Sequence, residues 1–340
     1  MKNTNAICYI QAAMMQDCFE QILNGLQFST DRAKQIAAVF TQNSLEGIYT
    51  HGVYRFPRFV EYVKKGLVQK DAFAIRTAKF NGIEQWDGQL APGISNAIAA
   101  TEQCMQLASE NGIGCVALSN TNHWMRGGTY GWQAAKAGYV FIGWTNTIAN
   151  MPAWGAIDAK LGNNPLVIAV PYKNDAIVID MAMSQYSFGA MELAAIKKEP
   201  LAVYGGFSSE GVLTTNPSEI IRSRRPLPIG YWKGAGLSLL LDILAAILSG
   251  GAATHAITKR EIEQGLSQVF IAIDITKLPN HSTMPGLLQS IIDDYHQSVA
   301  QDNSTGISYP GERVLRTRQN NLVNGIPVVQ SVWQTIEALK

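Results

Sequence analysis

Apolar residues in the middle of the chain follow two alternating spacings. Short runs rich in β-branched and aromatic residues, typical of buried strands, lie at 114–118, 140–144, 166–170, 176–180 and 269–273. Longer stretches with apolar residues three and four positions apart predict helices over 94–111, 130–137 and 237–249. Because strands and helices are interleaved, this region predicts an α/β body built on a central mixed sheet.

Both ends of the chain have helical spacing instead. Ser29 or Thr30 can begin one helix, and Pro57 suits the first turn of another. Helical patterning returns from about residue 285 and stops at the Gly-Ile-Pro of 325–327. We therefore predict a helical domain made of 1–75 plus 285–340, which flanks an α/β domain over 76–284.

Charge and composition exclude several classes of function. Lys and Arg number 27 against 26 Asp and Glu, so no overall field attracts nucleic acid or an anionic membrane. The apolar stretch at 237–248 is shorter than the roughly 20 residues that cross a bilayer, and Asp242 interrupts it. The N-terminus lacks a signal-peptide pattern, and the four cysteines have neither metal-ligand nor redox spacing. We expect a soluble protein of the reducing cytoplasm without a bound metal.

Common catalytic and cofactor motifs are missing from the sequence. A loose G-x-G-x-x-G match at 112–117 has the order helix, glycines, strand, which cannot place a pyrophosphate on a helix N-terminus. We interpret it as the end of a helix. The glycines at 234 and 236 precede a helix but lack the third glycine. No G-x-S-x-G, H-E-x-x-H, paired C-x-x-C or P-loop occurs, so a hydrolase or metalloenzyme is disfavoured.

His51 and Arg55 form the first candidate site. They are four positions apart, so a helical turn would place them on one face. An imidazole can donate a proton near neutral pH, and a guanidinium can hold a carboxylate with two hydrogen bonds. A 2-keto acid requires that pair, an acid beside the keto oxygen and a clamp on the carboxylate. A structural role for a histidine beside an arginine is the simpler alternative.

The segment 120–132 is the second candidate. It follows a predicted strand, leads into a predicted helix, and mixes polar amides, His123 and Arg126 with Trp and Tyr. Its glycines allow a close backbone approach, and a helix N-terminus favours an anion. This mixture suits a polyhydroxylated ligand, and a structural loop with aromatic packing explains it equally well.

Charged residues near two helix starts are weaker candidates. Lys233 precedes the most apolar helix and could reach a phosphate or carboxylate, although a solvated lysine is the simpler interpretation. Glu312 and Arg313 fit an ordinary helix start. Asp242, inside the apolar helix, favours a hydrogen-bonded core carboxylate over a catalytic group.

Several motifs together resemble one family. They are His51-Gly-Val-x-Arg55-x-Pro57, Asn122-His123, Gly162-Asn-Asn-Pro165, Asp180-Met-Ala-x-Ser184, Lys233-Gly-x-Gly236 and Pro310-Gly-Glu312. In this order they resemble the type-2 malate/L-lactate dehydrogenases, NAD(P)-dependent reductases of 2-keto acids, from about residue 25 onward. The resemblance implies a non-Rossmann NAD(P)-binding fold, which explains the missing glycine motif. His123-Trp-Met-Arg-Gly-Gly128 and Gly230-Tyr-Trp-Lys-Gly234 favour a subgroup that acts on a sugar-derived acid.

The resemblance also implies roles for individual residues. His51 matches the proton donor, and Arg55, His123 and Arg126 are expected to contact the substrate. The expected cofactor-binding residues are Asp175, Ala176, Ile177, Val178, Ile179, Asp180, Met181, Ala182, Trp232, Lys233, Gly311, Glu312 and Arg313. NADH is the expected cofactor, with NADPH left open. A homodimer is the expected assembly, with cofactor sites near the subunit interface.

Alternatives remain open at this point. The substrate could be a malate-, lactate- or ureidoglycolate-type acid, and Trp124 argues for a larger polyol. A non-catalytic sugar-acid binding protein could keep the same scaffold, but retention of both His51 and Lys233 disfavours it. A cofactor-free lyase built on His51 and Arg55 is the most remote alternative.

Overall fold

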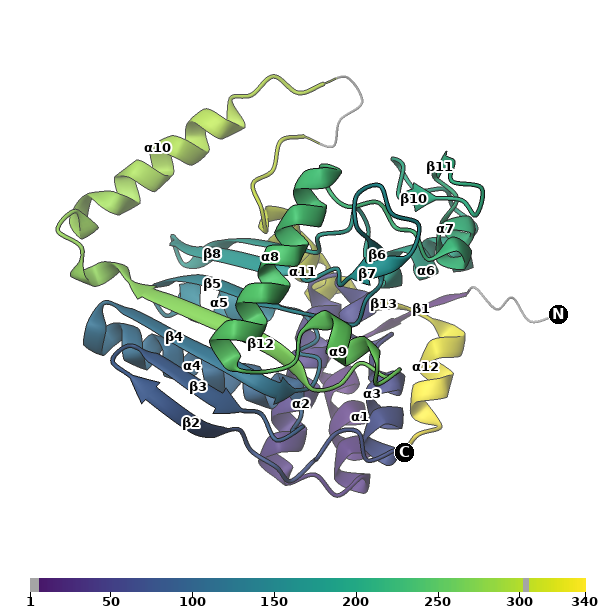
Figure 1. The fold of residues 1–340 in the computed structure, drawn as a ribbon, viewed down its shortest axis with the longest axis horizontal. Coiled ribbons are helices and arrows are strands. Elements are labelled where there is room, and N and C mark those ends of the chain that lie inside the picture. The colour runs from purple at the N-terminus through teal and green to yellow at the C-terminus, as the bar shows by residue number, and fades with distance from the viewer. Residues whose placement is uncertain (1–5, 302–305) are drawn as a thin grey trace.

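The centre of the molecule is a seven-stranded mixed sheet. The computed structural model describes residues 6–301 and 306–340. The strand order is β2-β3-β4-β12-β5-β8-β9 (Figure 1). The strands are β2 (Ile75–Phe80), β3 (Ile83–Asp87), β4 (Ile113–Thr121), β5 (Tyr139–Thr145), β8 (Leu166–Tyr172), β9 (Asp175–Met181) and β12 (Leu266–Asp274). Only β3 and β4 pair in parallel, so the mixed sheet is confirmed.

The two faces of this sheet carry separate cores. Val116 and Phe270 pack with α4 (Gly93–Asn111) and α5 (Gly128–Lys136). Their neighbours Ala117 and Val269 pack with α8 (Trp232–Ser249) on the other face. Strands covered on both faces, such as β4 and β12, are apolar at successive positions, which is why the sequence predicted them. Strands β5, β8 and β9 were predicted from their β-branched and aromatic residues. Gly112, with φ +84°, ends α4 as predicted.

A helical layer made from both chain ends flanks the sheet, as predicted (Figure 1). It contains α1 (Ala12–Gly25), α2 (Thr30–Leu45), α3 (Phe56–Lys64) and α12 (Gln330–Glu337). Its core includes Phe19 stacked on Phe56 with ring centroids 4.0 Å apart, and Phe40 meets Phe56 edge-on at 5.2 Å. Two short antiparallel strands, β1 (Ile7–Ile10) and β13 (Ile326–Val329), join the two chain ends. The sequence did not predict these strands or α12.

The remaining elements connect or extend this body. They are η1 (Tyr49–His51), β6 (Met151–Pro152), β7 (Ala159–Leu161), α6 (Phe188–Lys197), β10 (Gly206–Phe207), β11 (Leu213–Thr214), α7 (Pro217–Ser223), α9 (Thr254–Thr258), η2 (Ile275–Lys277), η3 (His281–Thr283), α10 (Met284–His296) and α11 (Glu312–Asn324). In Figure 1, α10 extends away from both layers. The domain limits 1–75 plus 285–340 and 76–284 stay a prediction.

Helix α8 is apolar on nearly all sides. Among the described residues it is the one helix long and apolar enough to cross a membrane, with a mean hydropathy of 1.5. One side packs on the sheet through Leu241 and Ala245. Its Asp242 carboxylate accepts hydrogen bonds from Asn146 Nδ2 at 2.9 Å and the Thr254 N–H at 2.8 Å. Asp242 is therefore a hydrogen-bonded carboxylate, as predicted, and it is half-buried.

Candidate active site

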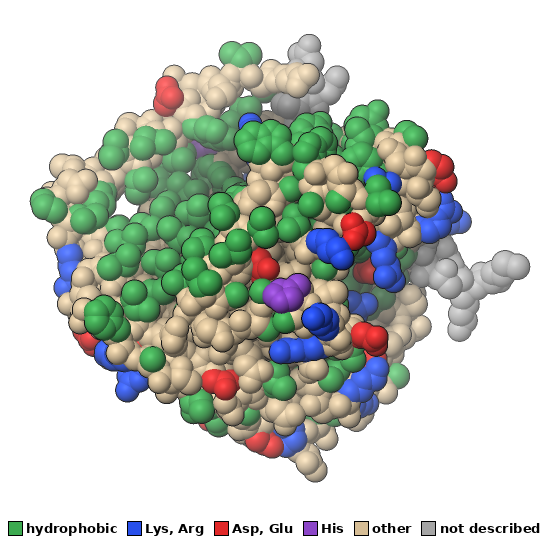
Figure 2. All heavy atoms as spheres, in the orientation of Figure 1, with side chains coloured by type: hydrophobic (Ala, Val, Ile, Leu, Met, Phe, Trp, Pro, Cys, Tyr) green, Lys and Arg blue, Asp and Glu red, His purple; other side chains and the backbone are tan. Residues whose placement is uncertain are grey.

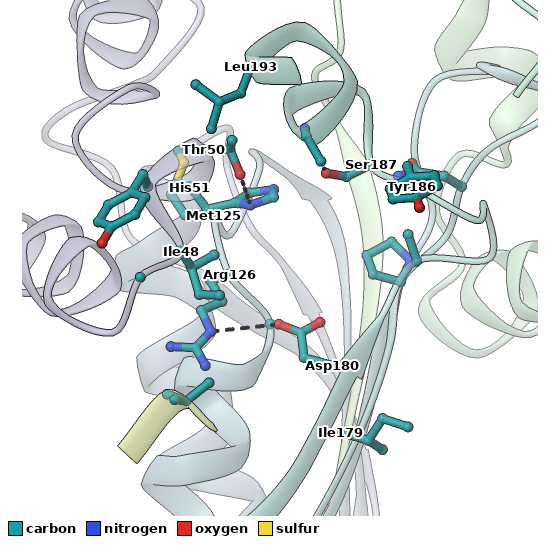
Figure 3. A pocket seen from close by; sticks show the side chains of 18 of the residues that line it. Ile48, Thr50, His51, Met125, Arg126, Ile179, Asp180, Tyr186, Ser187 and Leu193 are labelled. Carbon is teal, nitrogen blue, oxygen red and sulfur yellow. Dashed lines mark hydrogen bonds and ion pairs between the residues drawn. The ribbon is translucent and has the colours of Figure 1, made fainter. Parts of the chain in front are cut away.

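A cavity of about 760 Å³ lies where the helical layer meets the end of the sheet. Its walls come from the segment after α2, the loop after β4, the outer edge of β9, and α6 (Figure 3). The predicted site residues that line it are His51, His123, Arg126, Val178, Ile179, Asp180, Ala182 and Gly311. Residues from distant parts of the chain therefore meet in one cavity.

The backbone around His51 is tightly fixed. The Asn43 side chain donates a hydrogen bond to the His51 carbonyl at 3.0 Å, and Ser44 Oγ accepts from the Val53 N–H at 2.8 Å. A Cβ on Gly52 would lie 2.2 Å from Ser44 Oγ, so only glycine fits at that position. His51 Nδ1 lies 3.4 Å from Thr50 Oγ1 (Figure 3). The imidazole is thus held at the cavity wall by a rigid turn.

The charge state of His51 depends on its surroundings. Burial, and then the positive charges of Arg55 and Arg126, lower the pKa of His51 to about 4. The imidazole is therefore neutral at pH 7 when nothing else is bound. An anion beside these arginines would remove part of that cause and raise the pKa.

His123 also lies in the cavity wall, with its ring facing that of His51. The two rings are nearly parallel, 18° apart in plane, with centroids 5.8 Å apart. His123 Nδ1 accepts a hydrogen bond from the Met125 N–H at 2.9 Å, so in the neutral ring the proton is on Nε2. Burial, and then Arg55 and His51, lower the pKa of His123 well below its ordinary value. His123 is consequently a fixed hydrogen-bond donor that favours the neutral form.

Arg55 lies beside the lining and does not belong to it. It precedes α3, its side chain is 23% exposed, and its Nη2 lies 4.0 Å from Glu263 Oε1. Among the described residues, no hydrogen-bond partner occupies its Nε or Nη1. Arg55 can therefore still receive a carboxylate, although sequence reasoning did not foresee Glu263 next to it.

Arg126 is buried, and other side chains already hold it. Its Nη1 contacts Glu46, its Nε lies 4.0 Å from Asp180 Oδ2, and its guanidinium lies 4.9 Å from the Trp132 ring centre. Arg318 pairs with the other oxygen of Glu46. Burial opposes ionisation of Glu46, but the two arginines together bring its pKa below the ordinary value. Arg126 thus balances the negative charges of Glu46 and Asp180 in the cavity wall. These contacts leave its guanidinium less available for the predicted contact with a substrate.

The outer edge of β9 forms the opposite wall. Because β9 is the last strand of the sheet, its outward N–H and C=O groups have no neighbouring strand. The Val178 N–H donates to the Pro310 carbonyl at 3.1 Å, and Gly311, with φ +96°, lies against Val178 and Trp132. The Asp180 side chain is only 22% exposed and accepts from the Gly128 N–H, yet the whole residue is exposed. The exposed part of Asp180 is therefore its backbone, which faces the cavity beyond the point where Pro310 bonds to Val178.

The other expected cofactor residues lie outside this cavity. Asp175 and Glu312 line a second cavity of about 420 Å³ near the start of β9. Ala176 is buried, Ile177 and Met181 are half-buried, and Arg313 is exposed. Trp232, 64% exposed, and Lys233 begin α8 at the surface. The structure therefore brings only some of the expected cofactor-binding residues together. Trp232 and Lys233 of α8 lie apart from them.

A nicotinamide cofactor suits this geometry. The free edge of β9 offers backbone donors and acceptors beside apolar Val178 and Ile179, the combination that a flat carboxamide-bearing ring requires. A Cβ on Gly311 would lie 3.2 Å from the Trp132 ring, so the close approach of this loop requires glycine. No group of three or more His, Cys, Asp or Glu side chains that could hold a metal occurs within 6–301 and 306–340.

Comparisons with known proteins define the class. The family model described as malate/L-lactate dehydrogenase matches residues 10–337. The chain belongs to this family and is an oxidoreductase acting on CH–OH groups. The match begins earlier than the expected start near residue 25, so that expectation was wrong.

Individual relatives narrow the comparison. The chain is 43% identical over 326 residues to the 2,3-diketo-L-gulonate reductase of Citrobacter koseri, covering 96% of this chain and 98% of the relative. Malate dehydrogenase from Pyrococcus horikoshii superposes with a TM-score of 0.89 at 25% identity, covering 98% of this chain and 94% of that one. Malate dehydrogenase from Entamoeba histolytica, at 20% identity, shares the fold with a TM-score of 0.93, covering 98% and 97% of the two chains.

Proposed function

We propose that this protein reduces 2,3-diketo-L-gulonate at C2 to 3-dehydro-L-gulonate with NADH. The observation that carries the proposal is His51, held by a rigid turn in a cavity that also contains a second, fixed histidine donor. The relatives that share over 40% of their residues with this chain are named for that reaction. The broader statement, reduction of a 2-keto acid, follows from the family.

The chemistry assigned to the chain is proton transfer. When bound, NADH supplies the hydride that goes to C2 and becomes NAD⁺. His51, as imidazolium, gives its proton to the C2 oxygen, so the ketone becomes an alcohol. Because burial and the nearby arginines lower the pKa of His51 to about 4, the ring must take up a proton before this step. A substrate carboxylate on Arg55 favours that uptake, since it neutralises a charge that lowers the pKa of His51.

The cofactor is assigned to the edge of β9. The wall would be formed by Val178, Ile179, Asp180 and Ala182. Gly311 lets its loop lie close to Val178 and Trp132. The second cavity, with Asp175 and Glu312, would hold the far end of an extended dinucleotide. Asp175 pairs with Lys136 and Arg318, and Glu312 pairs with His296, so NADH is proposed from the family resemblance alone.

A homodimer would complete this arrangement. Leu240, Ile243 and Ile247 of α8 are exposed by 56%, 43% and 65%, and Figure 2 shows apolar side chains gathered on this face. An apolar patch of this kind marks an interface. Trp232 and Lys233 begin the same helix, so dimerisation would carry them toward a second subunit. The four cysteines are free, which supports a cytoplasmic location.

The proposal is tested by the loss of NADH absorbance with 2,3-diketo-L-gulonate, pyruvate and oxaloacetate in parallel. We expect the highest kcat/KM with diketogulonate, and a much lower one when NADPH replaces NADH. Preference for a short acid would contradict the substrate and retain the class. NADH binding without oxidation would move the proposal to another keto acid, and no binding would contradict the cofactor as well.

A further inference from the structure

One carboxylate sits among the cationic and histidine groups beside the cavity. Glu263 comes from the loop between α9 and β12, and it was not foreseen as part of the site. A single oxygen, Oε1, lies 4.0 Å from Arg55 Nη2 and 3.9 Å from His123 Nε2. Its other oxygen, Oε2, accepts a hydrogen bond from the Ile148 N–H at 3.3 Å, which anchors the carboxylate.

The three polar groups face one another without bonding. Separations of 3.9 and 4.0 Å exceed the length of a hydrogen bond. The side chains of Arg55, His123 and Glu263 keep 23%, 20% and 15% of their surface exposed, so a ligand atom can reach them. His123 itself lines the cavity.

The hydrogen-bonding types of these groups define what fits between them. His123 Nε2 carries a proton, because Nδ1 accepts from the Met125 N–H, and Arg55 Nη2 also donates. Glu263 Oε1 only accepts when it is ionised. A hydroxyl group both accepts and donates, so it satisfies both sides of this arrangement. A keto oxygen or a carboxylate can only accept and would face Glu263 unfavourably, so the substrate carboxylate proposed for Arg55 would use its Nε and Nη1 rather than the Nη2 near Glu263.

We propose that Glu263 determines substrate specificity by accepting a hydrogen bond from a hydroxyl group of the sugar-acid chain, while His123 or Arg55 donates to the same hydroxyl oxygen. The inference rests on the proposed function and adds the residue that distinguishes hydroxylated 2-keto acids from simple ones. The stacked rings of His51 and His123 connect this hydroxyl position to the proton donor, so it belongs to the part of the substrate beyond the reacting carbon.

The test compares Glu263→Gln with wild type on 2,3-diketo-L-gulonate and on pyruvate, which has no hydroxyl group. Gln keeps an amide oxygen that accepts a hydrogen bond but carries no charge, so kcat/KM for diketogulonate should fall by about 10-fold. The value for pyruvate should stay within about threefold. Glu261→Gln is the matched control, because this exposed residue of the same loop loses the same charge. It should behave as wild type with both acids.

A second variant and a second measurement separate this role from a structural one. Glu263→Asp keeps the charge beside Arg55 but shortens the side chain, so the same selective loss is expected. Competitive inhibition by L-gulonate should weaken about 10-fold in both variants, whereas inhibition by hexanoate, which lacks hydroxyl groups, should not change. Equal losses with hydroxylated and plain acids would overturn the inference. A wild-type enzyme that reduces no 2-keto acid would instead overturn the proposed function.

Discussion

At the scale of single residues, the site depends on how charge is distributed around His51. His51, the proposed proton donor, has no carboxylate partner among the described residues; its ring nitrogen faces Thr50, and two arginines lie nearby. Such surroundings favour the neutral imidazole. In the proposed mechanism, an anionic substrate on Arg55 would favour formation of the acid, which would tie proton uptake to binding.

The pH dependence of reduction follows from this arrangement. The pKa of His51 in the free enzyme is lowered to about 4, so its protonated fraction falls about tenfold per pH unit above that value. We expect kcat/KM for reduction to rise steadily as the pH is lowered from about 8 to 5. Oxidation of the product needs neutral His51 and should show no such loss at high pH. Initial rates in both directions measure this.

Arg55→Gln provides the matched variant for that profile. It removes one nearby cation, so the pKa of His51 should rise and the reduction profile should begin to level at a higher pH. Arg58→Gln, an exposed residue of α3, should leave the midpoint unchanged. A profile that is flat between pH 5 and 8 in the wild type would show that His51 is not the acid.

The sequence singled out His51 by its spacing from Arg55, and His123 by its segment of glycines, amides and aromatic residues. The family resemblance then implied their roles. Glu263 gave no local signal, since an ordinary loop glutamate becomes part of the site only through the fold that brings it to Arg55. The same is true of Glu46, whose value as a link between Arg126 and Arg318 depends on three separate segments.

At the scale of elements, the predicted strands were those with apolar runs, although β8 and β9 alternate between buried and more exposed positions. Strands β4 and β12 have continuous apolar runs that single them out in the sequence. All six residues of β2 are exposed, so it lacks such a run. Strands β1 and β13 have four residues each and are stabilised by pairing between the chain ends, which local periodicity cannot reveal.

The turn that carries His51 is the element whose geometry matters most. A Cβ on Gly52 would lie 2.2 Å from Ser44 Oγ and 2.8 Å from the Ser44 backbone nitrogen. Gly52→Ala should therefore destabilise the fold by about 1–3 kcal/mol and lower kcat by displacing His51. Urea unfolding and initial rates measure the two effects. Gly25→Ala, where no atom lies within 4 Å of the new Cβ, is the control. Equal stability of the two variants would contradict a tightly packed turn.

At the scale of the whole molecule, the exposed face of α8 is the main unexplained surface of the single chain. Replacing Leu240 and Ile247 by Glu should convert a dimer into a folded monomer, because each charge would be buried at an apolar interface. NADH affinity should fall at the same time if Trp232 and Lys233 act across the interface. Sedimentation and NADH fluorescence titration measure both. Phe80→Glu, a change at an equally exposed residue of β2, should have neither effect. An unchanged mass in the double variant would contradict this interface.

The central claim is that His51 supplies the proton in NADH-dependent reduction of 2,3-diketo-L-gulonate. The most direct measurement is the rate of NADH oxidation by His51→Ala, with NADH affinity determined on the same sample. We predict a turnover lower by roughly 10²- to 10⁴-fold, the usual loss when a general acid is removed, with NADH affinity retained. Turnover equal to that of the wild type would contradict the account.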